Sequence, residues 1–237
     1  ALIGTPTGHS YGFNIPWLIA FEAALAQGAA YPRHLPELWF NLGGLDFFFY
    51  GPLPFYLAAG PARWLCMGCA PQTVFALAGG LLWAGSALAF IPLARYFLPL
   101  GPALAAALVY ALLPYHLAVD WFLRQAVGEF AAYIFVPLMA AGMLRVLKEG
   151  RMGLLFPLAT AGLILCHLPS VLLAAHVFGA IFLIWAVIHP RAALPAAARL
   201  MAMGAVGLAL AALYWIPALT LLNDVSPTAL YAPPMTA

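Results

Sequence analysis

Long apolar runs with very few charges set the strongest constraint on the fold of this chain. An α-helix needs roughly 20 mostly apolar residues to cross a bilayer core of about 30 Å. Only 7% of the 237 residues are charged, against roughly 25% in soluble domains. We therefore predict an all-α, polytopic transmembrane helix bundle of six spans, at 71–96, 100–117, 129–147, 152–166, 171–188 and 200–222.

The composition also excludes several classes of protein. A soluble single-domain enzyme does not carry 66% hydrophobic residues. The nine Lys and Arg residues are spread over the whole length and make no basic stripe, so nucleic acid is not expected as a partner. The sequence contains no set of alternating stretches that would build a system of strands.

The basic residues predict how the bundle lies in the membrane. Cytoplasmic loops are enriched in Lys and Arg, and two connections between predicted spans carry such clusters. The clusters are Arg145, Lys148 and Arg151, and Arg191 and Arg199. Both connections are therefore expected in the cytoplasm, which puts residues 1–70 and the tail 223–237 on the external side. A chain that starts outside also implies a further span ahead of residue 1.

The first 70 residues are expected to form an external cap pressed onto the membrane. They are rich in aromatic residues and proline, and aromatic side chains anchor segments at the level of the lipid headgroups. We expect two short interfacial helices, at 15–26 and 35–41. The apolar run 53–69 is interrupted by Gly60-Pro61 and is not counted as a span. The chain thus divides into the cap 1–70, the bundle 71–222 and the tail 223–237.

Ionisable residues at membrane depth are costly, so they mark candidate functional sites. Arg124 and Glu129 lie five residues apart on the external side: Arg124 is in the stretch 119–128, which is expected to be a loop, and Glu129 begins the next predicted span. The planar guanidinium of an arginine suits a phosphate or a carboxylate. The alternative is a structural ion pair that locks two helices, because an unpaired buried charge is expensive.

Asp46 is a second candidate. It stands between Gly43-Gly44 and the aromatic run 47–50, which would bury its flanks. A carboxylate in that position can act as a general base on a substrate hydroxyl or as a metal ligand. It can equally cap a turn.

Two other features of the external side are candidates for ligand binding or for a disulfide. His167 lies at a helix break before Pro169, where it can contact a ligand headgroup or bond to a neighbouring carbonyl. Cys66 and Cys69 form a C-x-x-C on a side of the membrane where a disulfide is permitted. No second cysteine pair completes a zinc site, so we assign no metal.

Several short motifs occur in an order that resembles a known family. They are Gly8-His9-Ser10, Tyr31-Pro32-Arg33, the run 47–56, Pro114-Tyr115, Arg124 ahead of Glu129, His167-Leu168-Pro169-Ser170 and Trp215-Ile216-Pro217-Ala218. Together they resemble bacterial multispanning membrane proteins of the 6-pyruvoyl-tetrahydropterin-synthase-related family, which in turn look like type C glycosyltransferases. The resemblance runs through nearly the whole chain.

The resemblance implies an activity and assigns roles to residues. In type C glycosyltransferases an acid in the first external loop is the expected base. The implied donor is a sugar on a polyprenyl phosphate, bound where the external loops meet the bundle. By this resemblance His9 and Arg33 belong to the loop motif, Arg124 would bind the donor phosphate, Glu129 would orient it, and His167 would line the same site.

One departure from the family pattern bears on catalysis. Relatives carry an aspartate where this chain has Ser10, and a histidine where it has Asn14. A serine hydroxyl is uncharged at neutral pH and cannot replace a carboxylate as the base. Asp46, in the same loop, is then the candidate for the catalytic base.

Two functions stay open. The first is a membrane glycosyltransferase that moves a sugar from a polyprenyl-phosphate carrier to an acceptor on the external face. The second is a catalytically silent member of the fold, a structural or accessory subunit of a larger membrane complex with the aromatic cap as docking surface. A transporter is a weaker third, because no charged residue lies near the centre of a predicted span.

These readings share a location and a set of partners. We expect the chain in the bacterial inner membrane as a multi-pass protein. Membrane lipid is the expected partner in every case, joined by a polyprenyl-phosphate sugar in the first reading and by other subunits in the second. No cofactor is evident from the sequence, and a need for a divalent metal stays open.

Overall fold

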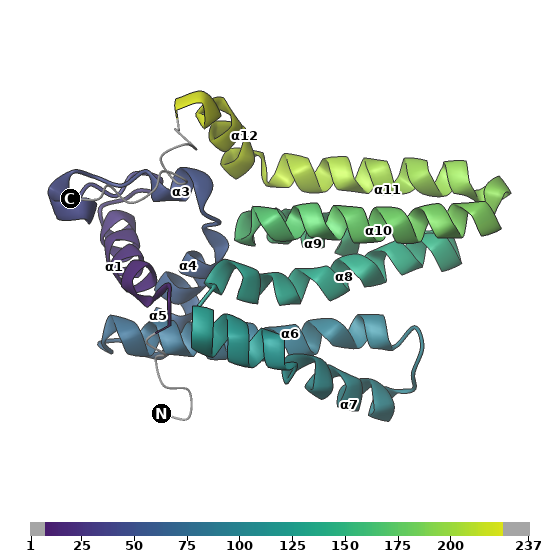
Figure 1. Ribbon diagram of the computed structural model, residues 1–237, viewed down its shortest axis with the longest axis horizontal. Helices are drawn as coiled ribbons and strands as arrows, with labels where there is room; N and C mark the ends of the chain where they lie inside the picture. The colour runs from purple at the N-terminus through teal and green to yellow at the C-terminus, as the bar shows by residue number, and fades with distance from the viewer. Residues whose placement is uncertain (1–7, 225–237) are drawn as a thin grey trace, which may run out of the picture.

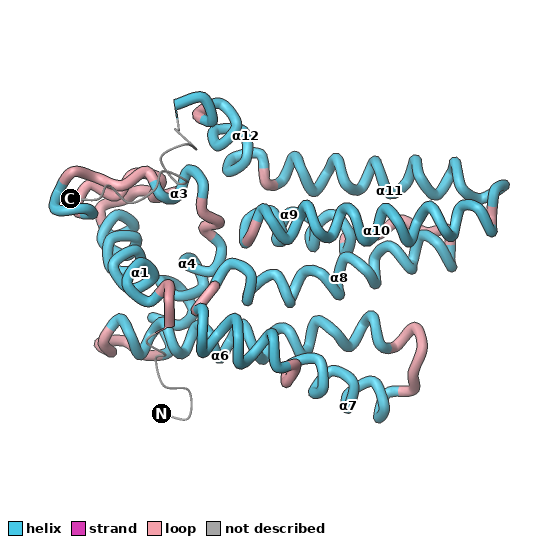
Figure 2. The backbone as a smooth tube through the Cα atoms, viewed as in Figure 1, coloured by secondary structure: helices cyan, strands magenta, loops and turns pink. Residues whose placement is uncertain are grey.

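The computed structural model describes residues 8–224 and is all-α in that range. Long helices run side by side, and shorter helices form a cap at one end of them (Figure 1). The loops gather in that cap and at the ends of the long helices (Figure 2). The expected tail 223–237 falls outside the described residues except for its first two.

Five helical segments are long and apolar enough to cross a membrane, so the chain is a multi-pass membrane protein by the length and composition of its helices. They are α6 (Pro71–Ala94), Leu100–Arg124, α8 (Val127–Glu149), α10 (Leu168–Ile188) and α11 (Pro190–Leu210). The second of them is not uniform, because α7 (Leu100–Ala111) ends before Pro114 and a π-helix, η2 (Tyr115–Arg124), continues it.

The fourth predicted span is shorter than expected. The prediction placed it at 152–166, but the helix there, α9 (Leu155–Cys166), has 12 residues and extends about 18 Å. That is less than the bilayer core requires. Most side chains of α9 are buried, chiefly against α8 and α11, so it works as a packing element. Gly162 allows this approach, since an added Cβ would overlap the ring of Phe135.

The last predicted span is displaced along the chain. Instead of one helix at 200–222, α11 begins at Pro190 and ends at Leu210, and a separate helix, α12 (Ala212–Thr220), follows. Proline suits the first helical position, and the alanine-rich residues after it favour helix. Arg191 and Arg199 therefore lie within α11 and not in a loop. A single turn of 3₁₀-helix, η3 (Leu222–Asp224), ends the described chain.

The cap consists of the short helices that precede the bundle. α1 (Tyr11–Ala26) matches the first predicted helix and begins four residues earlier. The second prediction, 35–41, is wrong in detail, because α2 (Leu38–Asn41) contains residues with positive φ and is closer to a left-handed turn. The remaining elements are α3 (Asp46–Phe49), α4 (Leu53–Leu57), the π-helix η1 (Ala58–Ala62) and α5 (Arg63–Leu65).

Aromatic rings form the core of the cap. Phe21, Phe47 and Phe55 are fully buried. The ring of Phe47 lies 4.9 Å from that of Phe21 and 4.8 Å from that of Phe55, both edge to face, an arrangement that aromatic quadrupoles favour. Arg63 donates two hydrogen bonds to Glu22, at 2.8 and 2.7 Å, and so ties α5 to α1. This aromatic core continues into the bundle, where Phe75 and Phe130 belong to the same buried cluster, so the cap and the bundle pack as one unit.

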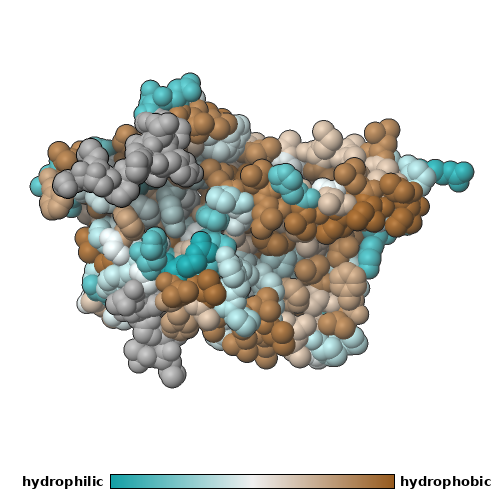
Figure 3. Space-filling view, viewed as in Figure 1, coloured by the Kyte–Doolittle hydropathy of each residue, from teal (hydrophilic) through white to brown (hydrophobic). Residues whose placement is uncertain are grey.

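The surface separates polar from apolar residues (Figure 3). Apolar residues cover much of the long helices, and polar residues gather near the cap and at the far ends. Leu172, Leu183 and Val187 of α10 are exposed, as on a helix that faces lipid. The connections that carry Arg95 and Arg151 leave from the end opposite the cap (Figure 1).

Candidate functional site

A polar cluster lies where the cap meets the bundle. η2 ends at Arg124, Gln125 turns the chain with a φ of 55°, and α8 brings Glu129 back to the guanidinium. Arg124 Nη1 donates to Glu129 Oε2 at 2.8 Å and to the Tyr115 oxygen at 2.9 Å. The Tyr115 hydroxyl donates to Glu129 Oε1 at 3.1 Å. The loop expected at 119–128 is thus mostly helix, and the turn at Gln125 lets the two charges meet.

Asp120 completes this polar cluster and is not among the predicted site residues. Its Oδ1 accepts a 2.8 Å hydrogen bond from Arg124 Nη1, and its side chain has no exposed area. Its Oδ2 is also buried, with no hydrogen-bond partner in the described part of the chain. A spacing of four from Arg124 would have indicated the pair, had the segment been read as a helix.

The charges of the polar cluster do not balance. The carboxylates of Asp120 and Glu129 share one nitrogen of one guanidinium, so the cluster carries an excess negative charge when both are ionised. Nη2 and Nε of Arg124 have no hydrogen-bond partner among residues 8–224, and 43% of its side chain is exposed. An anionic group can reach that free edge. It binds more strongly when a proton or a cation offsets one carboxylate.

The Gly8-His9-Ser10 motif lies against the backbone of the polar cluster. The His9 N–H donates to the Leu123 carbonyl at 3.2 Å, and the Ser10 N–H donates to the Arg124 carbonyl at 3.0 Å. Asn14 Nδ2 donates to the Gln125 carbonyl at 2.8 Å. These bonds bring the start of the cap to the end of η2, and they leave the His9 side chain exposed.

His167 approaches the same cluster from the turn between α9 and α10. Its Nδ1 lies 2.8 Å from Ser170 Oγ, and burial lowers the pKa of the imidazole, which keeps the ring neutral at pH 7. Gly128 makes the approach possible. A Cβ at that position would lie 2.7 Å from the Cys166 carbonyl oxygen and 3.4 Å from the His167 ring.

Arg33 and Asp46 make their contacts outside the polar cluster. Arg33 Nη2 donates to the Leu213 carbonyl at 2.7 Å, and the guanidinium carbon lies 4.5 Å from the centre of the Tyr31 ring. Asp46 Oδ2 accepts a 3.4 Å hydrogen bond from Trp39 Nε1. Neither residue forms a hydrogen bond or an ion pair with the polar cluster. Of the predicted site residues, the structure brings together Arg124, Glu129, His167 and, through its backbone, His9.

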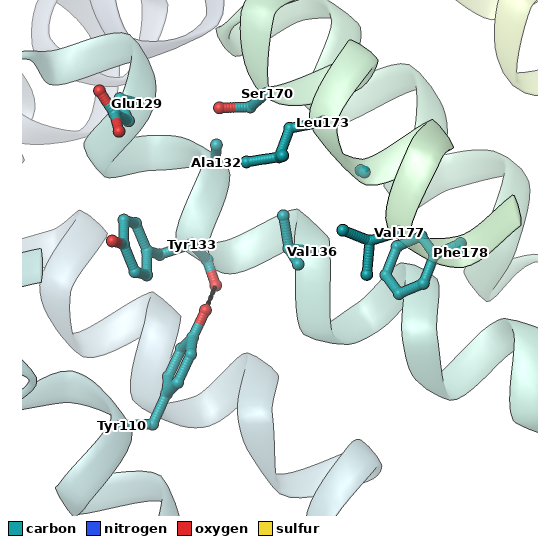
Figure 4. A pocket seen from close by; sticks show the side chains of 10 residues that line it. Tyr110, Glu129, Ala132, Tyr133, Val136, Ser170, Leu173, Val177 and Phe178 are labelled. Carbon is teal, nitrogen blue, oxygen red and sulfur yellow. Dashed lines mark hydrogen bonds between the residues drawn. The ribbon is translucent and has the colours of Figure 1, made fainter. Parts of the chain in front are cut away.

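An apolar groove of about 300 Å³ opens beside the polar cluster, between α8 and α10 (Figure 4). Glu129 and Ser170 lie toward one end of the groove, and Val136, Val177 and Phe178 lie toward the other. A groove with apolar walls and a polar end fits a ligand with a polar head and an apolar chain. The head would lie at Glu129, and the chain would follow α8 and α10.

Within residues 8–224, no three His, Cys, Asp or Glu side chains come together as a metal site would require. No protein-family model, no curated protein and no solved structure matches the chain.

Proposed function

We propose that the chain is a membrane glycosyltransferase-like protein that transfers a sugar from a polyprenyl-phosphate carrier to an acceptor on the external face. The observation that carries the proposal is the polar cluster at the end of the α8–α10 groove. A polyprenyl phosphate has the matching chemistry, with an anionic head and a long apolar chain. The order of the sequence motifs supports the same assignment by resemblance.

The proposal includes an orientation in the bacterial inner membrane. The cap and the polar cluster would lie outside, and the connections that carry Arg95 and Arg151 would lie in the cytoplasm. The enrichment of Lys and Arg in cytoplasmic loops supports this orientation. In it, α9 would return the chain from the inner to the outer side as the fourth of six passages, although its helix alone is shorter than the bilayer core.

The residues around the groove have proposed roles in binding. Arg124 would bind a phosphate oxygen through Nη2 and Nε, while Nη1 stays bonded to Asp120 and Glu129. These two carboxylates would hold the guanidinium in place. His167, whose Nδ1 is already bonded to Ser170, would offer Nε2 to the headgroup.

The base is the second requirement of a transferase. A carboxylate has to take the proton of the acceptor hydroxyl while the bond from sugar to phosphate breaks and the new glycosidic bond forms. Asp46 is the proposed base, and its present contact is with Trp39. Transfer would therefore require the turn that carries Asp46 to move toward the polar cluster when both substrates are bound.

The separation of Asp46 from the polar cluster favours a second candidate. A catalytically silent member of the fold would keep the lipid-phosphate site and act as an accessory subunit of a membrane complex. Ser10 adjoins the Arg124 backbone but offers no charge there. The cap also exposes apolar side chains, of which Phe40 is 98% exposed, and these give a surface for another subunit.

Sugar transfer in reconstituted vesicles separates the two candidates. The protein is inserted with polyprenyl-phosphate sugars, and transfer to an external acceptor is measured beside the binding of labelled lipid. A transferase predicts a loss of at least about 100-fold for Asp46→Asn, the scale of general-base catalysis. Arg124→Ala should lose binding as well, and Arg191→Ala, at the opposite end of the bundle, should keep both.

The other outcomes are equally specific. Binding that depends on Arg124 without any transfer would leave the silent subunit as the function. A wild-type protein that binds no lipid phosphate would refute the transferase and the lipid-phosphate site, and it would leave only a structural subunit without such a site.

A further inference from the structure

A second chemical site lies in the cap, apart from the polar cluster. Cys66 and Cys69 form a disulfide across two intervening residues. The bond spans the turn between α5 and α6, where the Cys69 N–H donates to the Cys66 carbonyl at 3.1 Å. Gly68 takes a φ of +82° in this turn, which suits a residue without a Cβ. Neither lipid binding nor sugar transfer uses this pair.

The turn is held in place by bonds other than the disulfide. Arg63 Nη1 donates to the Cys69 carbonyl at 2.6 Å, and the same guanidinium donates two hydrogen bonds to Glu22 of α1. The Cys69 backbone is thereby tied to α1 through Arg63. Opening the bond between the sulfurs leaves these contacts intact, so the reduced pair would keep its position.

The surroundings of the disulfide are open to a partner. Both cysteines are partly exposed. Met67 in the turn and Trp64 and Leu65 of α5 are exposed as well, with Met67 at 77% and Trp64 at 71%. An exposed apolar patch next to an accessible disulfide suits a brief contact with another protein.

The two sulfurs are not equivalent. Cys69 stands two residues before Pro71, the first residue of the 24-residue helix α6. The N-terminal end of a helix carries partial positive charge and favours a thiolate nearby. Cys69 is therefore the better leaving group, and Cys66 is the sulfur that a nucleophile attacks.

From this arrangement we propose that the Cys66–Cys69 disulfide is a thiol–disulfide exchange site that oxidises a dithiol of a protein partner on the same side of the membrane. A partner thiolate attacks Cys66 Sγ, the disulfide breaks, and Cys69 leaves as a thiolate. The partner's second thiolate attacks its own sulfur in the mixed disulfide and releases Cys66. The two protons from the partner's thiols pass to Cys66 and Cys69. The partner loses two electrons, and this pair gains them.

Native reduction of the full chain tests the proposal. The protein in detergent is titrated with dithiothreitol, quenched and alkylated, and the three cysteines are followed by peptide mass spectrometry. Cys166 is buried and serves as the internal control for unfolding. We expect Cys66 and Cys69 to become alkylated while Cys166 stays protected, and glutathione disulfide to restore the bond.

Two results would overturn the proposal. The first is a pair that opens only when Cys166 becomes alkylated too, because the disulfide would then be a structural crosslink. The second is that Cys66 and Cys69 are found as thiols when fresh membranes are alkylated, and that glutathione disulfide does not oxidise these thiols to the disulfide.

A matched pair of variants tests the order of attack. Cys66→Ser and Cys69→Ser each keep one thiol of the pair, and both are treated with glutathione disulfide at neutral pH. The variant that keeps Cys69 should react several-fold faster, because the helix end favours its thiolate. Equal rates would contradict the assigned roles of the two sulfurs.

Discussion

Asp120 is the fully buried member of the polar cluster, and its Oδ1 bonds to Arg124. Arg124→Ala would leave this carboxylate buried without its partner. Breaking a buried pair costs roughly 3–5 kcal/mol, and the 43% exposure of Arg124 reduces our expectation to about 2 kcal/mol of unfolding free energy. Arg124→Ala combined with Asp120→Asn should be more stable than Arg124→Ala alone. Thermal unfolding in detergent measures both, and strict additivity would show that the two residues are not coupled.

His167 gives the cluster a dependence on pH. Burial lowers its pKa in the folded protein from the ordinary 6.5, so below that pH the unfolded chain binds more protons than the folded one. The contribution of this group is fully present above pH 6.5 and is lost as the pH falls toward the lowered pKa. His167→Gln should therefore lose less stability than the wild type between about pH 7 and pH 5. Identical losses in the two unfolding series would count against a neutral, buried His167.

The sequence predicts some of these residues and misses others. The pairing of Arg124 with Glu129 could be predicted, because a short connection with two opposite charges has few other ways to satisfy them. Asp120 could not, because the stretch 119–128 is expected to be a loop, whereas the backbone continues as a π-helix to Arg124. Asp46 and Arg33 were expected in the same loop as His9. In the structure Asp46 accepts a hydrogen bond from Trp39 and Arg33 donates one to the Leu213 carbonyl, so neither contacts the polar cluster.

At the scale of helices, α9 and α11 depend on close packing at one glycine. A Cβ at Gly207 would lie 2.8 Å from the Pro157 carbonyl oxygen and 2.7 Å from Thr160 Cβ, whereas a Cβ at Gly204 on the same helix meets nothing within 4 Å. Gly207→Ala should cost about 1–3 kcal/mol through overpacking. Gly204→Ala should be neutral or stabilising by up to about 1 kcal/mol, because alanine favours helix. Thermal unfolding of the two variants in one detergent compares them, and equal effects would contradict the packing.

The helices themselves were only partly predictable. Hydropathy locates the long apolar segments, and α6, α8 and α10 follow it closely. It does not indicate where one helix stops and another starts inside an apolar run, so the break at Ala211 and the early start at Pro190 were missed. The run 152–166 is already short for a span in the sequence, but hydropathy does not show that its first residues stay outside the helix.

At the scale of the whole molecule, the proposed orientation puts the cap on the external side and the opposite end of the bundle in the cytoplasm. Glu37→Cys places a thiol on the exposed surface of the cap, and Arg151→Cys places one at the far end of the bundle. A membrane-impermeant maleimide added to intact spheroplasts should label residue 37 and should label residue 151 only after permeabilisation. The reverse pattern would invert the proposed topology and place the polar cluster in the cytoplasm.

The central claim is that a lipid phosphate binds at Arg124 with its chain between α8 and α10. The most direct measurement uses a polyprenyl phosphate that carries a photoreactive diazirine close to the phosphate. This lipid is reconstituted with the full chain, the sample is irradiated, and the crosslinked residues are mapped by peptide mass spectrometry. The account predicts crosslinks near Glu129 and Ser170 that disappear in Arg124→Ala and persist in Arg191→Ala. Crosslinks spread over the exposed faces of the bundle, or unchanged in Arg124→Ala, would contradict it.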